Sequence, residues 1–201
     1  MTDEQIFKNG STTYYWSSKF FPKHTRTDVF KLYSFVRIAD NYVDCIPQDK
    51  KNFNALVRAW NNVAKGKKIR QKEGNETNRV VQNMYDVAVK YDFDFAWIDA
   101  FLDSMKMDLK GRTYKNMDDT LEYIYGSAEV IGLMMAKILG VKKEAYEYAK
   151  LQGRAMQYIN FIRDISEDID LGRCYFPQSE LARYGLESLT PRIVARHRAE
   201  F

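Results

Sequence analysis

The chain has 201 residues, a net charge of +4, 45% hydrophobic residues and 29% charged residues. These values are ordinary for one folded domain with a sizeable core, and they exclude a disordered or fibrous chain. No apolar run approaches the ~20 residues of a membrane-spanning helix, and the sequence shows no signal peptide. We therefore expect a cytoplasmic protein, with peripheral membrane association left open. Two cysteines, Cys45 and Cys174, are too few for a disulfide framework, which agrees with a reducing compartment.

Apolar residues recur with helical spacing almost throughout the chain, and strand signals are weak. In chain order we expect long helices over residues 25–46, 49–65, 76–91, 94–109, 117–139 and 142–170. Pro177 and Pro191 each begin a short helix near the end of the sequence. The basic stretch KGKKIRQK, residues 65–72, is typical of a solvated loop, so no nucleic-acid partner is expected. Residues 1–201 are thus predicted to form a single all-α domain.

The first long helix contains an unusual polar stripe. Its segment VFKLYSFVRIADNYVDCI, residues 29–46, is apolar enough to be buried, yet it carries an arginine and two acids. At about 100° per residue, one narrow face of the helix carries Tyr33, Arg37, Asp40 and Asp44. Carboxylates one turn apart repel each other, and buried charge is costly unless it is paired or holds a metal. Because Mg²⁺ takes oxygen ligands and bridges carboxylates to phosphates, the stripe predicts a divalent-metal site.

The same construction recurs in QYINFIRDISED, residues 157–168. Amide and carboxylate groups share one helix face there: Gln157, Asn160, Asp164 and Asp168. Arg163 points about 100° away from Asp164, so it is available as a charge partner for another helix. One D-x-x-x-D pattern is usually a solvated face, but its repetition beside an arginine favours an acidic cleft for several metal ions. Spacing alone supports a divalent-metal site in a helical bundle.

Four stretches together resemble the phytoene and squalene synthase family of head-to-head prenyl transferases. YSFVRIADNYVD and QYINFIRDISEDIDLGRCYFP are similar to its two aspartate-rich motifs. GSTTYYWSSKFFP, residues 10–22, resembles its amino-terminal flap, and MDLKGRTYKNMDDTLEYIYGSAEVIG, residues 107–132, resembles its middle segment. The matches occur in the family's order over nearly the whole chain. They imply an isoprenoid-synthase-type helical bundle with a central cavity.

The resemblance also implies roles for individual residues. The implied metal ligands are Asp40, Asp44, Asp164 and Asp168. The implied catalytic residues are Tyr33, Arg37, Arg163 and Tyr175. The implied substrate-binding residues are Ser11, Thr13, Tyr123, Gln157, Asn160 and Arg173. Ser127 stands where relatives often carry an aliphatic residue, and relatives continue for several helices beyond Pro191, so we expect the family's C-terminal helices to be missing here.

The implied reaction joins two identical prenyl diphosphates. We expect geranylgeranyl diphosphate to give phytoene through a cyclopropyl diphosphate intermediate, with Mg²⁺ as cofactor and Mn²⁺ as a substitute. The alternative is farnesyl diphosphate giving squalene or dehydrosqualene, and NADPH is needed only for squalene. Pocket depth depends on tertiary packing, so the sequence leaves substrate length and oligomeric state open.

Three other interpretations share part of this pattern. A head-to-tail elongase or terpene cyclase shares the helical class, but elongases carry D-D-x-x-D where this chain has DNYVD. A di-iron bundle needs Glu-x-x-His pairs, and neither His24 nor His197 has a glutamate three residues before it. A non-catalytic helical assembly factor that keeps the fold remains an alternative.

Overall fold

The computed structural model describes residues 1–68 and 75–196, and within these ranges it contains helices and no strand. The amino-terminal half comprises α1 (Asp3–Gly10), α2 (Thr12–Ser18), α3 (Lys23–Asp44), α4 (Lys50–Ala64), α5 (Glu76–Lys90) and α6 (Phe95–Lys110). The remainder comprises α7 (Met117–Ile124), the π-helical turn η1 (Tyr125–Glu129), α8 (Val130–Ile138), the 3₁₀ turn η2 (Lys143–Ala145), α9 (Tyr146–Arg163), α10 (Ile165–Asp170), α11 (Gln178–Arg183) and α12 (Pro191–Arg196). The predicted all-α class is confirmed. In the described ranges no helix is both long and apolar enough to span a bilayer.

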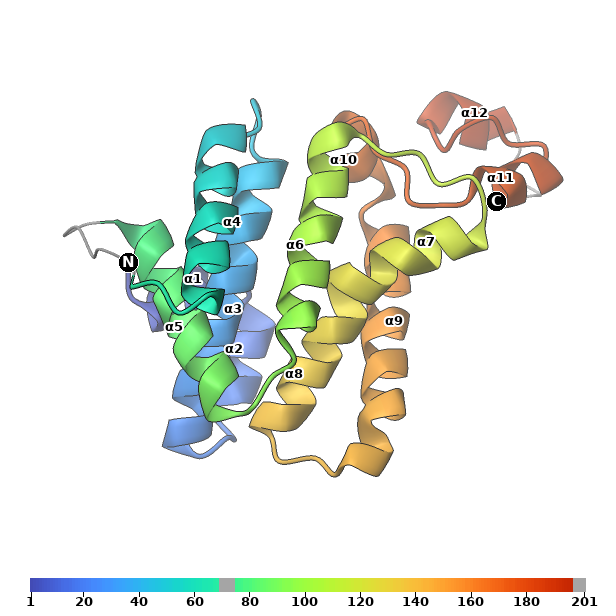
Figure 1. Ribbon diagram of the computed structural model, residues 1–201. Coiled ribbons are helices and arrows are strands. Elements are labelled where there is room, and N and C mark those ends of the chain that lie inside the picture. Colours follow the sequence, from blue (N-terminus) through green and yellow to red (C-terminus); the bar gives the residue numbers. More distant parts are fainter. Residues whose placement is uncertain (69–74, 197–201) are drawn as a thin grey trace.

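Helix α6 stands at the centre of the bundle (Figure 1). On one side it packs against α3 and α4, and on the other against α7, η1 and α8. Helices α1 and α5 complete the first group by packing against α3, and α2 packs against α1, while α9 packs against η1 and α8 in the second group. The two groups therefore leave α3 and α9 on opposite sides of α6, with their polar stripes free to face a common space.

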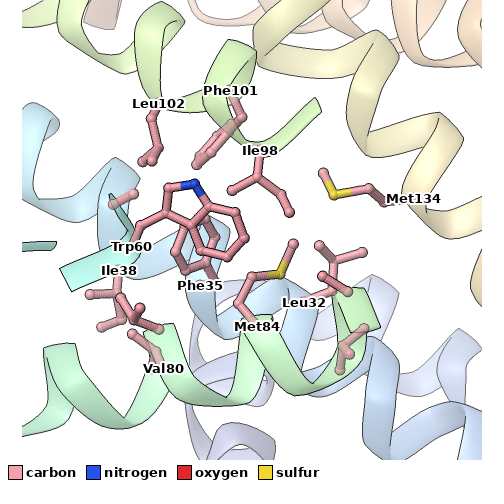
Figure 2. Close-up of a cluster of buried hydrophobic side chains, with 14 of the residues drawn as sticks. Leu32, Phe35, Ile38, Trp60, Val80, Met84, Ile98, Phe101, Leu102 and Met134 are labelled. Carbon is pink, nitrogen blue, oxygen red and sulfur yellow. The ribbon is translucent and has the colours of Figure 1, made fainter. Parts of the chain in front are cut away.

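A buried core rich in aromatic side chains holds α3, α4 and α6 together (Figure 2). The ring of Phe35 lies 6.2 Å from that of Trp60 and 6.0 Å from that of Phe101. Trp60 is completely buried, and its indole Nε1 donates a hydrogen bond of 2.8 Å to Asp99. Burying rings of this size stabilises the fold by a few kcal/mol each, about 25 cal/mol per Å² of apolar area. This core holds the apolar face of α3 against α4, so the polar stripe on the other face of α3 points away from α4.

The predicted helix ends agree with the structure to within a few residues, because local capping sets them. Side chains of Asp49, Asn75, Asp94 and Asn116 accept backbone hydrogen bonds at the starts of α4, α5, α6 and α7. Gly111 ends α6 in the left-handed conformation, with φ of 62°. Lys65 and Gly66 form the predicted turn after α4, and residues 69–72 of the basic stretch lie outside the described residues.

Three segments differ from the predicted elements. Residues 1–22, for which no helix is predicted, form α1 and α2, and a capping box between Thr2 and Gln5 begins α1. The helix predicted over 117–139 contains the π turn η1, at which Gly126 packs directly on the backbone of α6. The helix predicted over 142–170 is interrupted at Asp164, which has φ of −101° and ψ of 13°. The first interruption lies in the small-residue segment, and the second lies in the second acidic motif. Irregular helical turns of this kind are often found at functional sites.

Candidate functional site

A cavity of about 540 Å³ lies between α3 and α9–α10, with α6 and η1 forming its floor. All the predicted site residues except Ser11 and Thr13 line it. Further lining residues are Val36, Phe101, Met105, Asp108, Ser127, Phe161, Glu167 and Leu171. The polar stripes of the two predicted helices therefore face each other across one cavity with partly apolar walls.

Ser11 and Thr13 are placed beside this cavity but not on its wall. The hydroxyl of Ser11 caps α2 by accepting a bond from the amide of Tyr14. The end of α1 does touch the site, because a side chain at Gly10 would collide with the phenol of Tyr33. The substrate-binding role of the two hydroxyls thus remains a prediction.

On α3, the first acidic pair is held by two arginines. Arg37 Nη1 donates to Asp40 Oδ2 at 3.1 Å, within one helical turn. Burial, together with the neighbouring Asp44 carboxylate, raises the pKa of Asp40 to about 7. Like charges near an apolar wall therefore oppose full ionisation of this pair.

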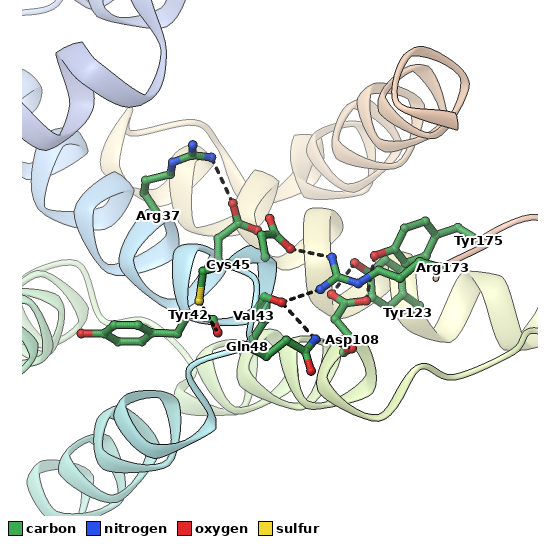
Figure 3. A network of polar contacts seen from close by, with 11 residues as sticks. Arg37, Tyr42, Val43, Cys45, Gln48, Asp108, Tyr123, Arg173 and Tyr175 are labelled. Carbon is green, nitrogen blue, oxygen red and sulfur yellow. Dashed lines mark hydrogen bonds and ion pairs between the residues drawn. The ribbon is translucent and has the colours of Figure 1, made fainter. Parts of the chain in front are cut away.

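Arg173 connects the end of the second motif to α3 (Figure 3). Its Nη1 donates to Asp44 Oδ1 at 2.5 Å, and its Nη2 donates to the carbonyl oxygen of Val43 at 2.6 Å. The guanidinium is buried, and its Nε has no hydrogen-bond partner in the described part of the chain. A planar fork with several donors can join two acceptors at once, which a lysine cannot do in the same geometry.

Asp108 is a site residue that the sequence analysis missed. It is buried on α6 and accepts hydrogen bonds from Tyr123 Oη at 2.9 Å and Tyr175 Oη at 2.8 Å (Figure 3). Burial raises the pKa of Asp108 to about 6, even though Arg173 and the two phenols favour its charged form. The sequence did contain a signal for this buried acid. Asp108 lies seven residues after Phe101 and therefore on the apolar face of its helix.

Aromatic rings form the wall around Asp108. The ring of Tyr175 stacks on that of Phe161 with centroids 4.7 Å apart and planes 5° apart. Tyr123 lies 4.7 Å from Tyr175, and Tyr114 lies 5.6 Å from Tyr123. Burial raises the pKa of the Tyr123 and Tyr175 phenols, so both stay neutral. The wall therefore offers ring faces and neutral hydroxyls to whatever occupies the cavity.

The second acidic pair lies at the break between α9 and α10. Arg163, which helix geometry makes available to another helix, instead donates through Nε and Nη2 to the carboxylate of Asp164 at 2.6 Å. Side chains of adjacent residues diverge on a regular helix, so this pairing goes with the interrupted backbone at Asp164. Burial and the Asp164 carboxylate raise the pKa of Asp168 to about 7. Both acidic pairs thus contain one carboxyl group that resists ionisation.

A family model described as squalene/phytoene synthase matches residues 7–198. The chain belongs to this family. Among curated relatives, 15-cis-phytoene synthase of Pantoea ananas is 32% identical over 189 residues, and that of Enterobacter agglomerans is 35% identical over 181 residues. Each alignment covers 88% of this chain, and 59% and 61% of the relative. The 4,4'-diapophytoene synthase of Staphylococcus haemolyticus is 26% identical and covers 90% of this chain and 63% of the relative. This chain therefore spans about three fifths of the length of these family members.

Two solved structures share the fold of this family member. A dehydrosqualene synthase in complex with ligand matches with a TM-score of 0.78 at 24% identity, covering 98% of this chain and 70% of that one. The squalene synthase HpnC from Alicyclobacillus acidocaldarius matches with a TM-score of 0.73 at 20% identity, covering 98% and 77%. At these identities the likeness establishes the helical architecture alone.

The two acidic motifs offer carboxylate oxygens, the ligands that Mg²⁺ prefers. Within residues 1–68 and 75–196, no three acidic, histidine or cysteine side chains converge on one point. Mg²⁺ is commonly bound through one or two carboxylates, with waters and substrate phosphates completing its shell. Burial first, and the neighbouring carboxylate second, raise the pKa of Asp40 and of Asp168, so a cation beside either pair would favour its fully ionised form. The residues thus fit a cation that shares its ligands with a bound anion.

Proposed function

We propose that this cavity binds prenyl diphosphates and serves a head-to-head condensation of two of them, with geranylgeranyl diphosphate giving phytoene. One observation carries the proposal: two D-x-x-x-D pairs face each other across a cavity that also has aromatic and apolar walls. The acidic end suits a metal-bound diphosphate, and the apolar walls suit an isoprenoid chain. Relatives at 32% and 35% identity that are named phytoene synthases support the choice of product.

The carboxylates have the first role in this proposal. Asp40 and Asp44 on α3, with Asp164 and Asp168 at the α9–α10 break, would hold Mg²⁺, for which Mn²⁺ could substitute. Such an ion, when bound, neutralises the charge that develops on a departing diphosphate. With such an ion bound, the four side chains would hold the diphosphate ends of both substrates at the acidic end of the cavity.

The arginines and one tyrosine would contact the diphosphates directly. Arg37 and Arg163 are partly exposed at the cavity, with side-chain exposures of 40% and 65%, so both can turn from their acids toward an anion. Burial raises the pKa of Tyr33, which keeps its phenol neutral and able to donate a hydrogen bond. Charge-assisted donors of this kind assist the loss of an anionic leaving group.

The aromatic wall would protect the allylic cation that ionisation leaves. Ring faces attract a cation without forming a bond to it. The raised pKa values of Tyr123 and Tyr175 matter here, because a phenolate would trap the cation as an ether. Their protons are directed to Asp108, which holds both rings in place. The double bond of the second prenyl diphosphate would then attack this cation, and loss of a proton to the released diphosphate would close the cyclopropane ring. Departure of the second diphosphate, rearrangement and loss of a second proton to a released diphosphate would complete phytoene.

Product analysis by mass spectrometry tests this proposal. Farnesyl and geranylgeranyl diphosphates are supplied separately with Mg²⁺, each with and without NADPH. We expect phytoene from geranylgeranyl diphosphate, whereas squalene or dehydrosqualene from farnesyl diphosphate would support the alternative substrate. Absence of product and of released diphosphate with both substrates would refute catalysis by this chain and favour a non-catalytic helical factor.

Two carboxylate variants and one control sharpen the test. Asp40→Asn and Asp164→Asn should lose most product, while Asp103→Asn, on the exposed face of α6, should keep it. Mg²⁺ together with a non-hydrolysable prenyl diphosphate analogue should raise the melting temperature more than either alone, because each relieves the charge that the other brings. Wild-type turnover in either cavity variant, or melting that is insensitive to metal, would contradict the assigned role of the acids.

A further inference from the structure

The cavity has a far end opposite its acidic end. On α3 the residues that line it run from Asp44 back to Tyr33, and on α9 they run from Asp164 back to Gln157. Tyr33 and Gln157 each lie seven residues, or two helical turns, before an aspartate of the site. At ~1.5 Å per residue along a helix, the lining of α3 and α9 therefore stops about 10 Å from the acids.

Ser127, on η1, lines the same far end. A Cβ at its neighbour Gly126 would collide with the carbonyl oxygen of Ala100, which places Ser127 at the level of Phe101 on α6. Phe101 is the lining residue of α6 that lies farthest from the acids, seven residues before Asp108. Among the described residues of the cavity wall, Ser127 has the smallest side chain. A larger side chain at this position would therefore shorten the cavity.

Helix α8 fills the space beyond Ser127. It contacts α3, α6 and α9, and it buries Val130 and Met134 in the core that it shares with α3 and α6. Its Gly132 packs so closely on α9 that a Cβ there would collide with the carbonyl oxygen of Ala149. An apolar chain that enters from the acidic end is therefore stopped at the level of Ser127.

The backbone around Ser127 is held from two sides, and its hydroxyl is unpaired. The contact at Gly126 fixes η1 on α6, and Arg154 Nε of α9 donates to Glu129 Oε1 of η1 at 2.7 Å. The Oγ of Ser127 is buried and has no hydrogen-bond partner among the residues that the structure describes. An apolar group pressed against an unpaired hydroxyl leaves it desolvated, which costs free energy. A chain end that reaches Ser127 thus meets a fixed wall and a hydroxyl that it cannot satisfy.

We propose that Ser127 limits the length of the prenyl chain that the cavity accepts; this inference rests on the proposed function. The small side chain leaves room for the last isoprene unit of a geranylgeranyl chain, and the unpaired hydroxyl weakens the contact with that unit. A farnesyl chain is one unit shorter and ends before it reaches Ser127. Substitutions at this position should therefore change the binding of the longer chain and leave that of the shorter chain unchanged.

Calorimetric titration tests the proposal without turnover. Non-hydrolysable analogues of farnesyl and geranylgeranyl diphosphate are each titrated into the full chain with Mg²⁺. Ser127→Leu should weaken binding of the geranylgeranyl analogue at least ~10-fold, because the added carbon atoms occupy the far end of the cavity. Ser127→Ala should strengthen it about threefold, because the unpaired hydroxyl is removed. Both variants should bind the farnesyl analogue like the wild type.

Leu171→Phe is the matched control for added bulk. Leu171 also lines the cavity, but it lies at the acidic end, three residues after Asp168. Its substitution should therefore affect the two analogues equally. Melting temperatures without ligand check the fold of each variant. Ser127→Ala should melt like the wild type, because the hydroxyl that it removes has no partner in the described part of the chain.

Two kinds of failure can be told apart. If Ser127→Leu weakens both analogues equally, or weakens neither, the role of Ser127 in length selection is overturned while the condensation proposal stands. If Ser127→Leu does not fold, Ser127→Ala decides, and an unchanged ratio of its two affinities would likewise overturn that role. A wild-type protein that binds neither analogue would contradict the proposed function and this inference together.

Discussion

The substitution Asp108→Asn is expected to change the stability of the protein in a pH-dependent way. Asp108 is 6% exposed and accepts two phenolic hydrogen bonds. Asparagine has nearly the same shape and resembles the protonated acid, because it keeps one acceptor oxygen and carries no charge. The variant therefore isolates the effect of ionising a carboxyl group at this buried position.

The magnitude follows from the pKa. Burial raises the pKa of Asp108 from an ordinary value of 3.8 to about 6. A group whose pKa is raised by folding stabilises the folded state fully below its unfolded pKa, and that contribution is lost as pH rises through the folded pKa. At 1.36 kcal/mol per pKa unit, the wild type should lose ~2.5 kcal/mol between pH 4 and pH 8, with ~1.5 kcal/mol of that above pH 5. Asp108→Asn does not undergo this loss, although one phenol loses a charged acceptor at a cost of ~1–2 kcal/mol.

Urea denaturation of both proteins at several pH values, followed by circular dichroism, measures this difference. At pH 5 we expect the variant to be equal to or less stable than the wild type. At pH 8 it should have gained ~1.5 kcal/mol relative to the wild type. Asp103→Asn is the control on the same helix, because its exposed carboxylate pairs with Lys106 and should give a wild-type pH profile.

A difference in stability between wild type and Asp108→Asn that stays constant from pH 5 to pH 8 would refute this reasoning. It would mean that Tyr123, Tyr175 and Arg173 compensate the buried carboxylate completely. A variant that loses stability progressively as pH rises would refute it more strongly, because Asp108 would then have a lowered pKa and act as a paired structural charge.

Three further outcomes are expected from equilibrium denaturation. Burial raises the pKa of Asp28, but hydrogen bonds from Lys90 and its neighbouring tyrosine outweigh burial and hold that pKa below its ordinary value. The stability that Asp28 contributes is therefore present above the ordinary pKa of an aspartate and is lost as pH falls. Asp28→Asn should lower the free energy of unfolding by ~2 kcal/mol at pH 7 and by less at pH 3. An equal loss at both pH values would contradict this. Gly153→Ala should cost ~1–3 kcal/mol, because the new Cβ would lie 2.5 Å from the carbonyl oxygen of Ala128; an unchanged urea midpoint would show that α9 can shift. Arg173→Lys should cost ~1–3 kcal/mol by leaving one of two acceptors unpaired, and a wild-type melting curve would show that the planar fork is dispensable.

The acidic motifs show how far local pattern predicts the candidate site. Asp40 and Asp44, like Asp164 and Asp168, could be assigned to common helix faces because a helical period relates residues three and four apart. The structure does bring these faces to one cavity. Capping residues and glycines likewise predict the helix ends, since each acts on backbone groups only a few residues away.

Contacts between distant segments required the folded structure. Arg173 meets Asp44 across 129 residues, and Asp108 binds Tyr175 across 67, so no local period relates these partners. The raised pKa values of Asp40 and Asp108 arise from burial by several helices at once. The sequence by itself therefore determined the helical class and the polar face of each helix, because both follow from neighbours along the chain. Which faces meet, which acid is buried and where a helix breaks were decided by tertiary packing, because those energies depend on groups that only the fold brings together.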